Sequence, residues 1–381
     1  MSKLQFIIFI CLQLKIFIIS ADNTFQVLSD IGEKGASFTS FTNNLFFLSS
    51  TKVYNIINEN FHLIRDNKNN SDTQSPFFKN FEMVEASINK NTNESDILIA
   101  ESWDNKVNLY SFNLSAPLIQ NNNPKLLDCI NSSVDNSKIS LIKVANDKYF
   151  LSYFLKGNKI ENKLFKYASY EGYSVIKTYE HNVVNNGNNY ISCFLLYGQI
   201  PVCYYTEKTI TTVSGSETIK YKQKIMAFDI VIDRTLSKIS DAILSEDNDE
   251  PKFNKAIYLS NDYAVFCYIK ATGELFYVVV KIEIDHYDFF TFTISVSVPS
   301  GLSGSITNCL NDAYKFDLIK IDEENFLIGC VKNDNNKIIF DFVTVRDSNS
   351  DNIFDTLDKQ NFEISQKVET TLTFFTYILN N

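Results

Sequence analysis

A polar residue followed by a short apolar run recurs along the chain, and this recurrence constrains the fold more than any other feature. The six copies begin their apolar runs at Leu45, Ile97, Tyr149, Tyr190, Tyr263 and Phe326. Successive copies are separated by 52, 52, 41, 73 and 63 residues. A period of about 50 residues is typical of a β-propeller, in which each blade is a four-stranded sheet. The spacing therefore predicts an all-β propeller of six or seven four-stranded blades, and we expect seven.

The clearest copy is a complete β-hairpin near the end of the chain. An apolar run at 326–331 and a returning strand at 338–345 flank Asn333-Asp334-Asn335-Asn336, which are residues that tolerate turn conformations. The segment 318–321 leads into this hairpin just as 141–144 leads into Tyr149, at the same spacing. Both segments therefore predict a strand, a tight turn and a second strand.

The composition favours strands over helices. The chain has 32 Phe and 20 Tyr but few Gly, Pro and Met (11, 6 and 3), and aromatic residues are enriched in β-sheets. Tandem β-sandwiches are the alternative fold, because their strands also recur at short intervals. In a propeller, we expect the C-terminal strand at 371–379 to pair near the N-terminal strand and so close the ring without exposed sheet edges.

The N-terminal segment has the layout of a signal peptide. Lys3 precedes an apolar run, and the small residues Ser20-Ala21 follow it. This layout predicts cleavage of residues 1–21, which leaves a single propeller domain at 22–381 in a secreted or cell-surface protein. The alternative is an uncleaved signal anchor that tethers the protein to a membrane, although Gln13 and Lys15 interrupt the apolar run.

If the protein is secreted, its cysteines can form disulfides and its sequons can be glycosylated. Six cysteines remain after the leader, and disulfides are common in oxidising compartments. Cys193 and Cys203 flank the turn at Gly198-Gln199 symmetrically, so we expect them to pair; Cys309 with Cys330 is a second candidate pair. Sequons predict N-glycosylation at Asn69, Asn93, Asn113 and Asn131.

The net charge narrows the class of partner. The formal charge is −10 at pH 7, whereas nucleic-acid binding needs basic patches that neutralise phosphates. Peripheral binding to anionic membranes is disfavoured for the same reason. We therefore expect extracellular protein or glycan partners, no nucleic acid, and no membrane insertion after signal cleavage.

One loop has the side chains of a calcium site. Asp347, Asn349, Asp351 and Asp355 place oxygen atoms at alternate positions and at the ninth position of the loop, and Ca²⁺ takes roughly six to eight oxygen ligands. This loop resembles the calcium hairpins of FG-GAP (integrin α type) propellers, and the resemblance implies these four residues as ligands. Asn352 stands where that family has Gly. An ordinary polar turn is the alternative.

Motifs of catalysis are missing from the sequence. It contains no GxSxG elbow, no HExxH pair and no P-loop, and it has only three His. This pattern favours a non-catalytic module that binds proteins or glycans or acts as a cell-surface scaffold. A secreted glycoside hydrolase or lyase is one alternative, because two carboxylates can converge in three dimensions without a sequence motif. A self-associating structural coat protein is another.

Overall fold

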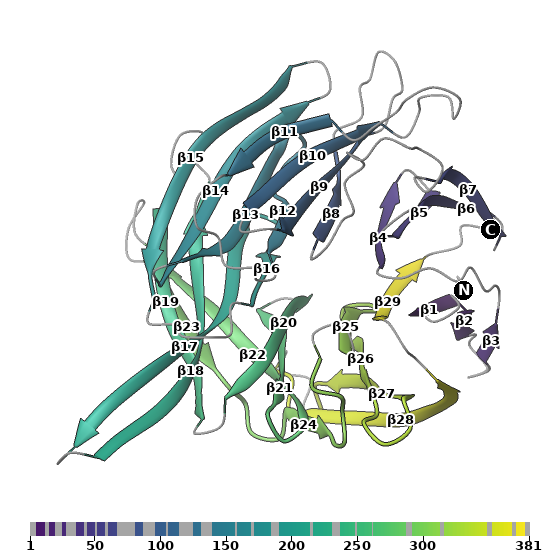
Figure 1. Cartoon of the computed structure of the whole chain (residues 1–381). Helices are drawn as coiled ribbons and strands as arrows, with labels where there is room; N and C mark the ends of the chain where they lie inside the picture. The colour runs from purple at the N-terminus through teal and green to yellow at the C-terminus, as the bar shows by residue number, and fades with distance from the viewer. Residues whose placement is uncertain are drawn as a thin grey trace.

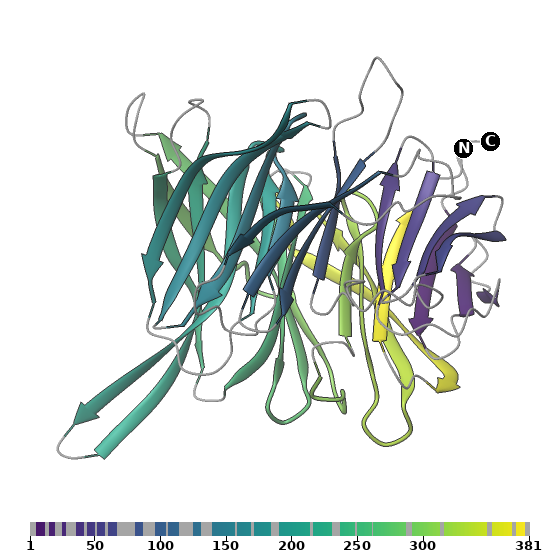
Figure 2. The same ribbon diagram turned by 45° about the horizontal axis from the view of Figure 1, so that its top comes forward.

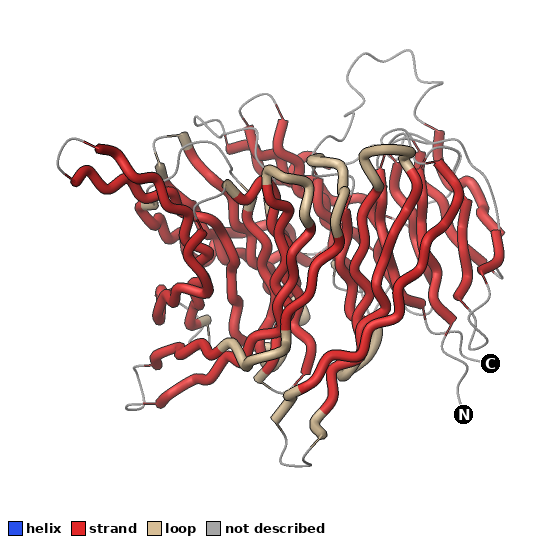
Figure 3. Tube along the Cα trace, turned by 90° about the horizontal axis from the view of Figure 1, so that it is seen from below, coloured by secondary structure: helices blue, strands red, loops and turns tan. Residues whose placement is uncertain are grey.

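A computed structural model of the chain describes the residues 5–11, 15–19, 25–27, 36–41, 44–49, 52–57, 60–66, 81–86, 96–103, 106–113, 125–130, 139–156, 158–168, 171–183, 190–213, 216–230, 237–247, 250–260, 262–286, 292–312, 316–348, 353–367 and 371–377. Side chains are described within the range 82–364. The regular structure in these residues consists of β-strands (Figure 3). In the same residues, no helix has the length and apolar character needed to cross a membrane.

Seven antiparallel sheets form a ring around a common centre (Figure 1). Each sheet is one blade, and its strands follow one another from the centre outwards. Blade 1 contains β29 (Thr371–Tyr377), β1 (Gln5–Cys11), β2 (Lys15–Ile19) and β3 (Phe25–Val27). Blade 2 contains β4 (Ala36–Phe41), β5 (Asn44–Ser49), β6 (Lys52–Ile57) and β7 (Asn60–Asp66). Blade 3 contains β8 (Phe81–Glu85), β9 (Asp96–Trp103), β10 (Lys106–Asn113) and β11 (Lys125–Ile130).

The remaining blades repeat this order. Blade 4 contains β12 (Ser140–Lys143), β13 (Lys148–Leu155), β14 (Lys159–Ala168) and β15 (Gly172–Asn182). Blade 5 contains β16 (Ile191–Leu196), β17 (Ile200–Val213), β18 (Ser216–Asp229) and β19 (Ser237–Asp247). Blade 6 contains β20 (Pro251–Ser260), β21 (Tyr263–Lys270), β22 (Leu275–His286) and β23 (Phe292–Ser297), and β24 (Ser303–Ile306) also pairs with β22. Blade 7 contains β25 (Phe316–Lys320), β26 (Asn325–Val331), β27 (Lys337–Arg346) and β28 (Thr356–Lys367).

The innermost strands close the ring. They contact one another in the order β29, β4, β8, β12, β16, β20, β25 and again β29. The prediction of a propeller with seven blades is thereby confirmed, and the alternative of tandem sandwiches is wrong because the sheets form one closed ring. Apolar side chains fill the spaces between adjacent blades. For example, one buried cluster joins Tyr277 of blade 6 to Phe326 of blade 7.

Blade 1 is completed by both ends of the chain. The C-terminal strand β29 pairs with β1 over seven residue pairs, from Gln5↔Tyr377 to Cys11↔Thr371. β1 and β2 lie within the segment predicted as a signal peptide, residues 1–21. Removal of that segment would take away the strand that pairs with β29. Cleavage and this pairing therefore exclude each other in one molecule, and cleavage stays a prediction.

The structure explains the irregular spacing of the sequence repeat. In blades 2 to 7, the second strands begin at Asn44, Asp96, Lys148, Ile200, Tyr263 and Asn325, which gives intervals of 52, 52, 52, 63 and 62 residues. The copy at Tyr190 lies at the first strand of blade 5, whereas the other five copies lie in second strands; the second strand of blade 5 begins at Ile200. Both strands of that hairpin start with short apolar runs, so the pattern did not distinguish them.

The longest of the described strands form the second hairpin of blade 5. Its strands, β17 and β18, are the second and third strands of blade 5. Each is 14 residues long. Both strands continue beyond the edge of the ring and project from it as a two-stranded arm (Figure 2).

Candidate functional site

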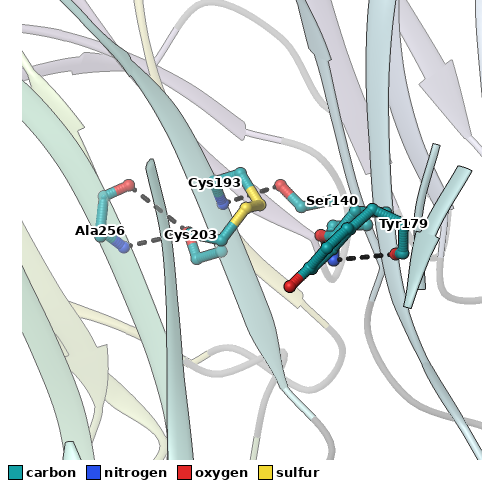
Figure 4. The surroundings of a disulfide bond; sticks show 8 residues. Ser140, Tyr179, Cys193, Cys203 and Ala256 are labelled. Atoms are coloured by element: carbon teal, nitrogen blue, oxygen red, sulfur yellow. Dashed lines mark hydrogen bonds between the residues drawn. A yellow bond between two sulfur atoms is a disulfide. The ribbon is translucent and has the colours of Figure 1, made fainter. Parts of the chain in front are cut away.

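Polar groups of the innermost strands join adjacent blades around the centre of the ring. The Oγ atom of Ser140 on β12 accepts a hydrogen bond from the backbone N–H of Cys193 on β16, at 2.9 Å. In the next pair of blades, the Oγ atom of Ser192 accepts a hydrogen bond from the backbone N–H of Ala256 at 3.0 Å. Figure 4 shows these contacts on either side of the Cys193–Cys203 disulfide. These side chains hold neighbouring blades together.

An ion pair makes the corresponding connection between blades 6 and 7. The Nζ atom of Lys255 on β20 contacts the carboxylate of Asp317 on β25, and Asp317 also accepts a hydrogen bond from the backbone N–H of Leu318 at 2.9 Å. Burial lowers the pKa of Lys255, but the charge and hydrogen bond of Asp317 and the charge of Glu82 raise it by more. Lys255 is therefore a cation that neutralises the carboxylate beside it.

Carboxyl groups whose pKa values shift in opposite directions lie between blades 3 and 4, away from the innermost strands. Burial raises the pKa of Asp128, but hydrogen bonds from Tyr173 (2.6 Å) and Lys163 (3.1 Å) lower it by more. Burial raises the pKa of Glu161, which accepts a hydrogen bond from Tyr153. These contacts brace the two blades.

A tyrosine in an unusual backbone conformation lies at the tip of the first hairpin of blade 5. The turn between β16 and β17 is closed by a hydrogen bond from the backbone N–H of Gln199 to the carbonyl oxygen of Leu196, at 3.1 Å. Its central residues, Tyr197 and Gly198, have φ values of 53° and 69°. Turns with two positive φ values strongly prefer Asn-Gly, and a non-glycine residue there costs about 1–2 kcal/mol. The side chain of Tyr197 is nonetheless 44% exposed.

Several polar side chains surround Tyr197 on this face of the ring. The Tyr197 hydroxyl donates a hydrogen bond to Asp262 of blade 6. Burial, that hydrogen bond and the nearby charges of Asp262 and Glu283 raise the pKa of Tyr197, so its hydroxyl is protonated at neutral pH. Lys320 of blade 7 lies over the ring of Tyr258, with its Nζ atom 5.2 Å from the ring centroid, at a distance typical of cation–π contacts.

We call this group the tyrosine patch. Its members come from three blades and share one face of the propeller, and they are Tyr197, Tyr258, Asp262, Lys281, Glu283 and Lys320. Because every first strand runs in the same direction in a propeller, the turns that follow β16, β20 and β25 gather on one face. The patch therefore combines an exposed aromatic ring with charged groups of both signs.

The hairpin that carries Tyr197 is held by a disulfide. Cys193 and Cys203 occupy directly opposite positions on β16 and β17 and are joined covalently. Cys309 and Cys330 are also joined. Both predicted disulfides are thus confirmed. The first supports the turn on which the patch is built.

The remaining predicted sites lie partly outside the described residues. Of the four sequons, Asn113 is the last residue of β10. The other three, at Asn69, Asn93 and Asn131, lie outside the described residues, so glycosylation stays a prediction. Of the calcium loop, Asp347 and Asp355 are described, whereas Asn349 and Asp351 are not.

Hydrogen bonds join the two described ends of the calcium loop, Ser348 and Asp355. The carboxylate of Asp355 accepts hydrogen bonds from Ser348, one of them from the backbone N–H at 3.1 Å, and these hydrogen bonds lower the pKa of Asp355. Within the described residues, no group of three or more His, Cys, Asp or Glu side chains is arranged to hold a metal ion.

The tyrosine patch was not predicted from the sequence. Its residues are separated by up to 123 positions, from Tyr197 to Lys320, so no local motif connects them. One signal was present, because Tyr197 precedes Gly198 at a turn position that Asn or Asp usually occupies.

Comparison with known proteins finds structural likeness without a sequence relative. Neither a family model nor a curated protein matches the sequence. Similar solved structures include the WD40 domain of SCAP from fission yeast, at 8% identity and a TM-score of 0.48, with 95% of this chain and 87% of that chain covered. A six-bladed fungal lectin from Aleuria aurantia is 8% identical, with a TM-score of 0.39 and coverage of 76% and 88%. A Synechocystis apocarotenoid oxygenase is 9% identical, with a TM-score of 0.42 and coverage of 93% and 75%. Likenesses of this size concern the fold alone. The chain is a seven-bladed β-propeller.

Proposed function

We propose that this propeller is a non-catalytic, extracellular binding protein that recognises a glycan through the tyrosine patch. The observation that supports this function is Tyr197, an aromatic side chain that is 44% exposed on a backbone with positive φ. Unfavourable backbone conformations of this kind cluster at functional sites. A turn selected only for stability would carry Asn at this position.

The chemistry of the patch suits a sugar. An aromatic ring can stack on the apolar face of a pyranose, while carboxylates accept hydrogen bonds from hydroxyl groups and lysines donate to ring or carboxyl oxygens. The Tyr197 hydroxyl is neutral, since burial and Asp262 raise its pKa, and because its proton is donated to Asp262 it can accept a hydrogen bond from a sugar hydroxyl. A protein partner is the alternative, since tyrosine is also enriched at protein interfaces.

Extracellular location is part of the same proposal. Two disulfides join cysteines of the described chain, and disulfides persist in oxidising compartments. The four sequons of the sequence agree with that location.

Replacing Tyr197 is expected to abolish glycan binding without unfolding the protein. Tyr197→Ala should weaken binding to hits on a printed glycan array by about tenfold or more, because it removes the stacking surface. Tyr197→Asn should have the same effect on binding while leaving the free energy of unfolding within about 1 kcal/mol of the wild type, since Asn accepts a positive φ. Affinity would be measured by calorimetric titration with the hit oligosaccharide, and stability by thermal unfolding.

Tyr221→Ala is the matched control, because this half-buried tyrosine lies on β18, outside the patch. It should bind like the wild type. Two results would overturn the proposal: no glycan retained by the wild-type protein, or Tyr197→Ala with unchanged affinity. In the first case, capture of an extracellular protein that depends on Tyr197 would assign the patch to a protein partner.

We also propose that the loop from Asp347 to Asp355 binds Ca²⁺ and stiffens the connection between β27 and β28. Titration calorimetry with CaCl₂ should show binding in the wild type and none in Asp351→Ala, because a carboxylate ligand is lost. Asp334→Ala, in the turn between β26 and β27, is the control and should bind normally. The absence of heat in the wild type, or equal binding by both variants, would rule the site out.

A further inference from the structure

The arm at the end of β17 and β18 leaves the blade and keeps an unpaired edge. β16 pairs with β17 only as far as Tyr205, whereas β17 pairs with β18 as far as Val213. On the other side, β19 pairs with β18 only from Tyr221 onwards. The arm therefore comprises 206–213 and 216–220, and among the described strands none covers the outer edge of 206–213 (Figures 1 and 2).

The outer part of this edge, residues 209–213, lacks the features that usually protect an exposed strand. Natural edge strands carry lysines, prolines or bulges that prevent pairing with another chain. The stretch Thr209-Ile210-Thr211-Thr212-Val213 has no charge, no Pro and no Gly, and all five residues are β-branched. The pairing of β17 with β18 runs without a register shift. Such a regular, uncharged edge is suited to accept another strand.

Alternate residues of β17 direct their backbone N–H and C=O groups away from β18. These groups determine the register in which another strand can pair with the open edge. The hairpin loop has two residues, because Val213 pairs directly with Ser216. In such a hairpin the pair beside the loop is hydrogen bonded, and hydrogen-bonded pairs alternate along the ladder. The backbone groups of Lys208, Ile210 and Thr212 therefore point towards the open edge.

An identical strand matches this edge when a two-fold axis passes through Ile210. Ile210 then faces Ile210 of the second copy, and Lys208 faces Thr212, so no like charges meet. Thr209 faces Thr211, which is a favourable cross-strand pair. On the same face, Ile210 lies opposite Ile219, and these side chains are 44% and 38% exposed. Pairing would align four isoleucines in one row across the new sheet.

Charge also favours the arm as the point of contact. The whole chain has a formal charge of −10, so two copies repel one another through their ring-shaped bodies. The arm has no net charge, with two lysines and two glutamates, and it projects away from the ring. Contact through the arm brings the two copies together while their bodies stay apart.

We propose that the open edge of β17 binds the same edge of a second copy, so that two arms form one antiparallel four-stranded sheet. This inference goes beyond the proposed function and adds to it. β16 ends at the tyrosine patch and β17 runs back across the ring, so the arm leaves from the opposite face. A dimer of this kind presents two patches, and two linked sites bind a multivalent surface more tightly than one.

Light scattering after size-exclusion chromatography tests the proposal on the full chain. The wild type should shift towards twice the mass of one chain as its concentration rises from ~1 to ~100 μM, a range in which modest interfaces form. Ile210→Lys should keep the mass of a single chain, because two like charges would meet at the two-fold axis. Its thermal unfolding should match the wild type, since Ile210 is exposed. Val298→Lys is the control: Val298 is 48% exposed outside the arm, and this variant should still dimerise.

Cysteine cross-linking tests the register. In an oxidising buffer, Ile210→Cys should form a covalent dimer, because directly opposite residues lie ~5.5 Å apart between Cα atoms. Ile219→Cys has the same residue type and similar exposure, but its two copies would be separated by three strand spacings, or ~14 Å, beyond the reach of a disulfide.

Three outcomes of these two experiments would overturn the proposed dimer. A wild type that stays a single chain at every concentration, a dimer that survives Ile210→Lys, or equal cross-linking of the two cysteine variants would do so. These results are separate from glycan binding, which is measured on the tyrosine patch and does not require the arm. A monomer that binds glycan would refute the dimer alone.

Discussion

Asp317→Leu should lower the free energy of unfolding by about 3 kcal/mol, because removal of one partner from a largely buried ion pair leaves the other charge uncompensated. The side chain of Asp317 is 6% exposed and that of Lys255 is 30% exposed. The partial exposure of Lys255 places the expected loss at the lower end of the range for buried pairs. The affected contact joins the innermost strands β20 and β25 of neighbouring blades.

Denaturant unfolding of purified variants, followed by circular dichroism, measures this loss. The double variant Lys255→Met/Asp317→Leu should recover most of it, since neither buried charge then remains. Lys252→Met is the matched control, because Lys252 pairs with Glu250 at 3.2 Å with both side chains about one-third exposed. It should change stability by less than about 1 kcal/mol. If Asp317→Leu were as stable as the wild type, the ion pair would not contribute to joining blades 6 and 7.

Loss of the Cys309–Cys330 disulfide should have an effect of similar size. The bond closes a loop with a sequence separation of 21 residues, and the loop-entropy relation gives about 3 kcal/mol for a loop of this length. The double variant Cys309→Ala/Cys330→Ala is therefore expected to unfold at clearly lower denaturant concentration than the wild type. The bond ties the segment after β24 to β26, which lies in the core between blades 6 and 7.

The second disulfide provides an internal comparison. Cys193 and Cys203 are separated by 10 residues, so their removal should cost about 0.7 kcal/mol less by the same relation. Cys129→Ala, which alters a cysteine outside both bonds, should change stability by less than about 1 kcal/mol. The reverse order of the two disulfide variants would contradict the chain-entropy explanation and would point to local packing instead.

Most of the propeller could be predicted because its strands are local in sequence. Blade 7 shows this well, since apolar runs and an Asn-rich turn predicted the hairpin that the structure contains as β26 and β27. At blade 5 the repeat was marked on a different strand from the other blades. There the first two strands both begin with short apolar runs, and the marker fell at Tyr190, beside β16, instead of at the start of β17. A pattern that reports only local hydrophobicity cannot tell which strand of a blade it marks.

The disulfide of blade 5 and the tyrosine patch differ in whether the sequence alone could predict them. Cys193 and Cys203 flank one tight turn, so hairpin pairing alone places them opposite each other. The tyrosine patch is different, because Tyr197, Asp262 and Lys320 belong to three blades. Their proximity depends on the packing angle between sheets, which no hairpin pattern specifies.

The sequence by itself therefore determined the all-β class, the approximate repeat, the positions of turns and the pairing of cysteines across a hairpin. These features follow from backbone preferences and from the period of two in a strand, which act over a few residues. Tertiary structure alone decided how the ring closes, which polar groups join the blades, and that Tyr197 meets Asp262. The physical reason is that these contacts link segments roughly one blade apart, about 50 residues or more, and form only when the sheets pack around a common centre.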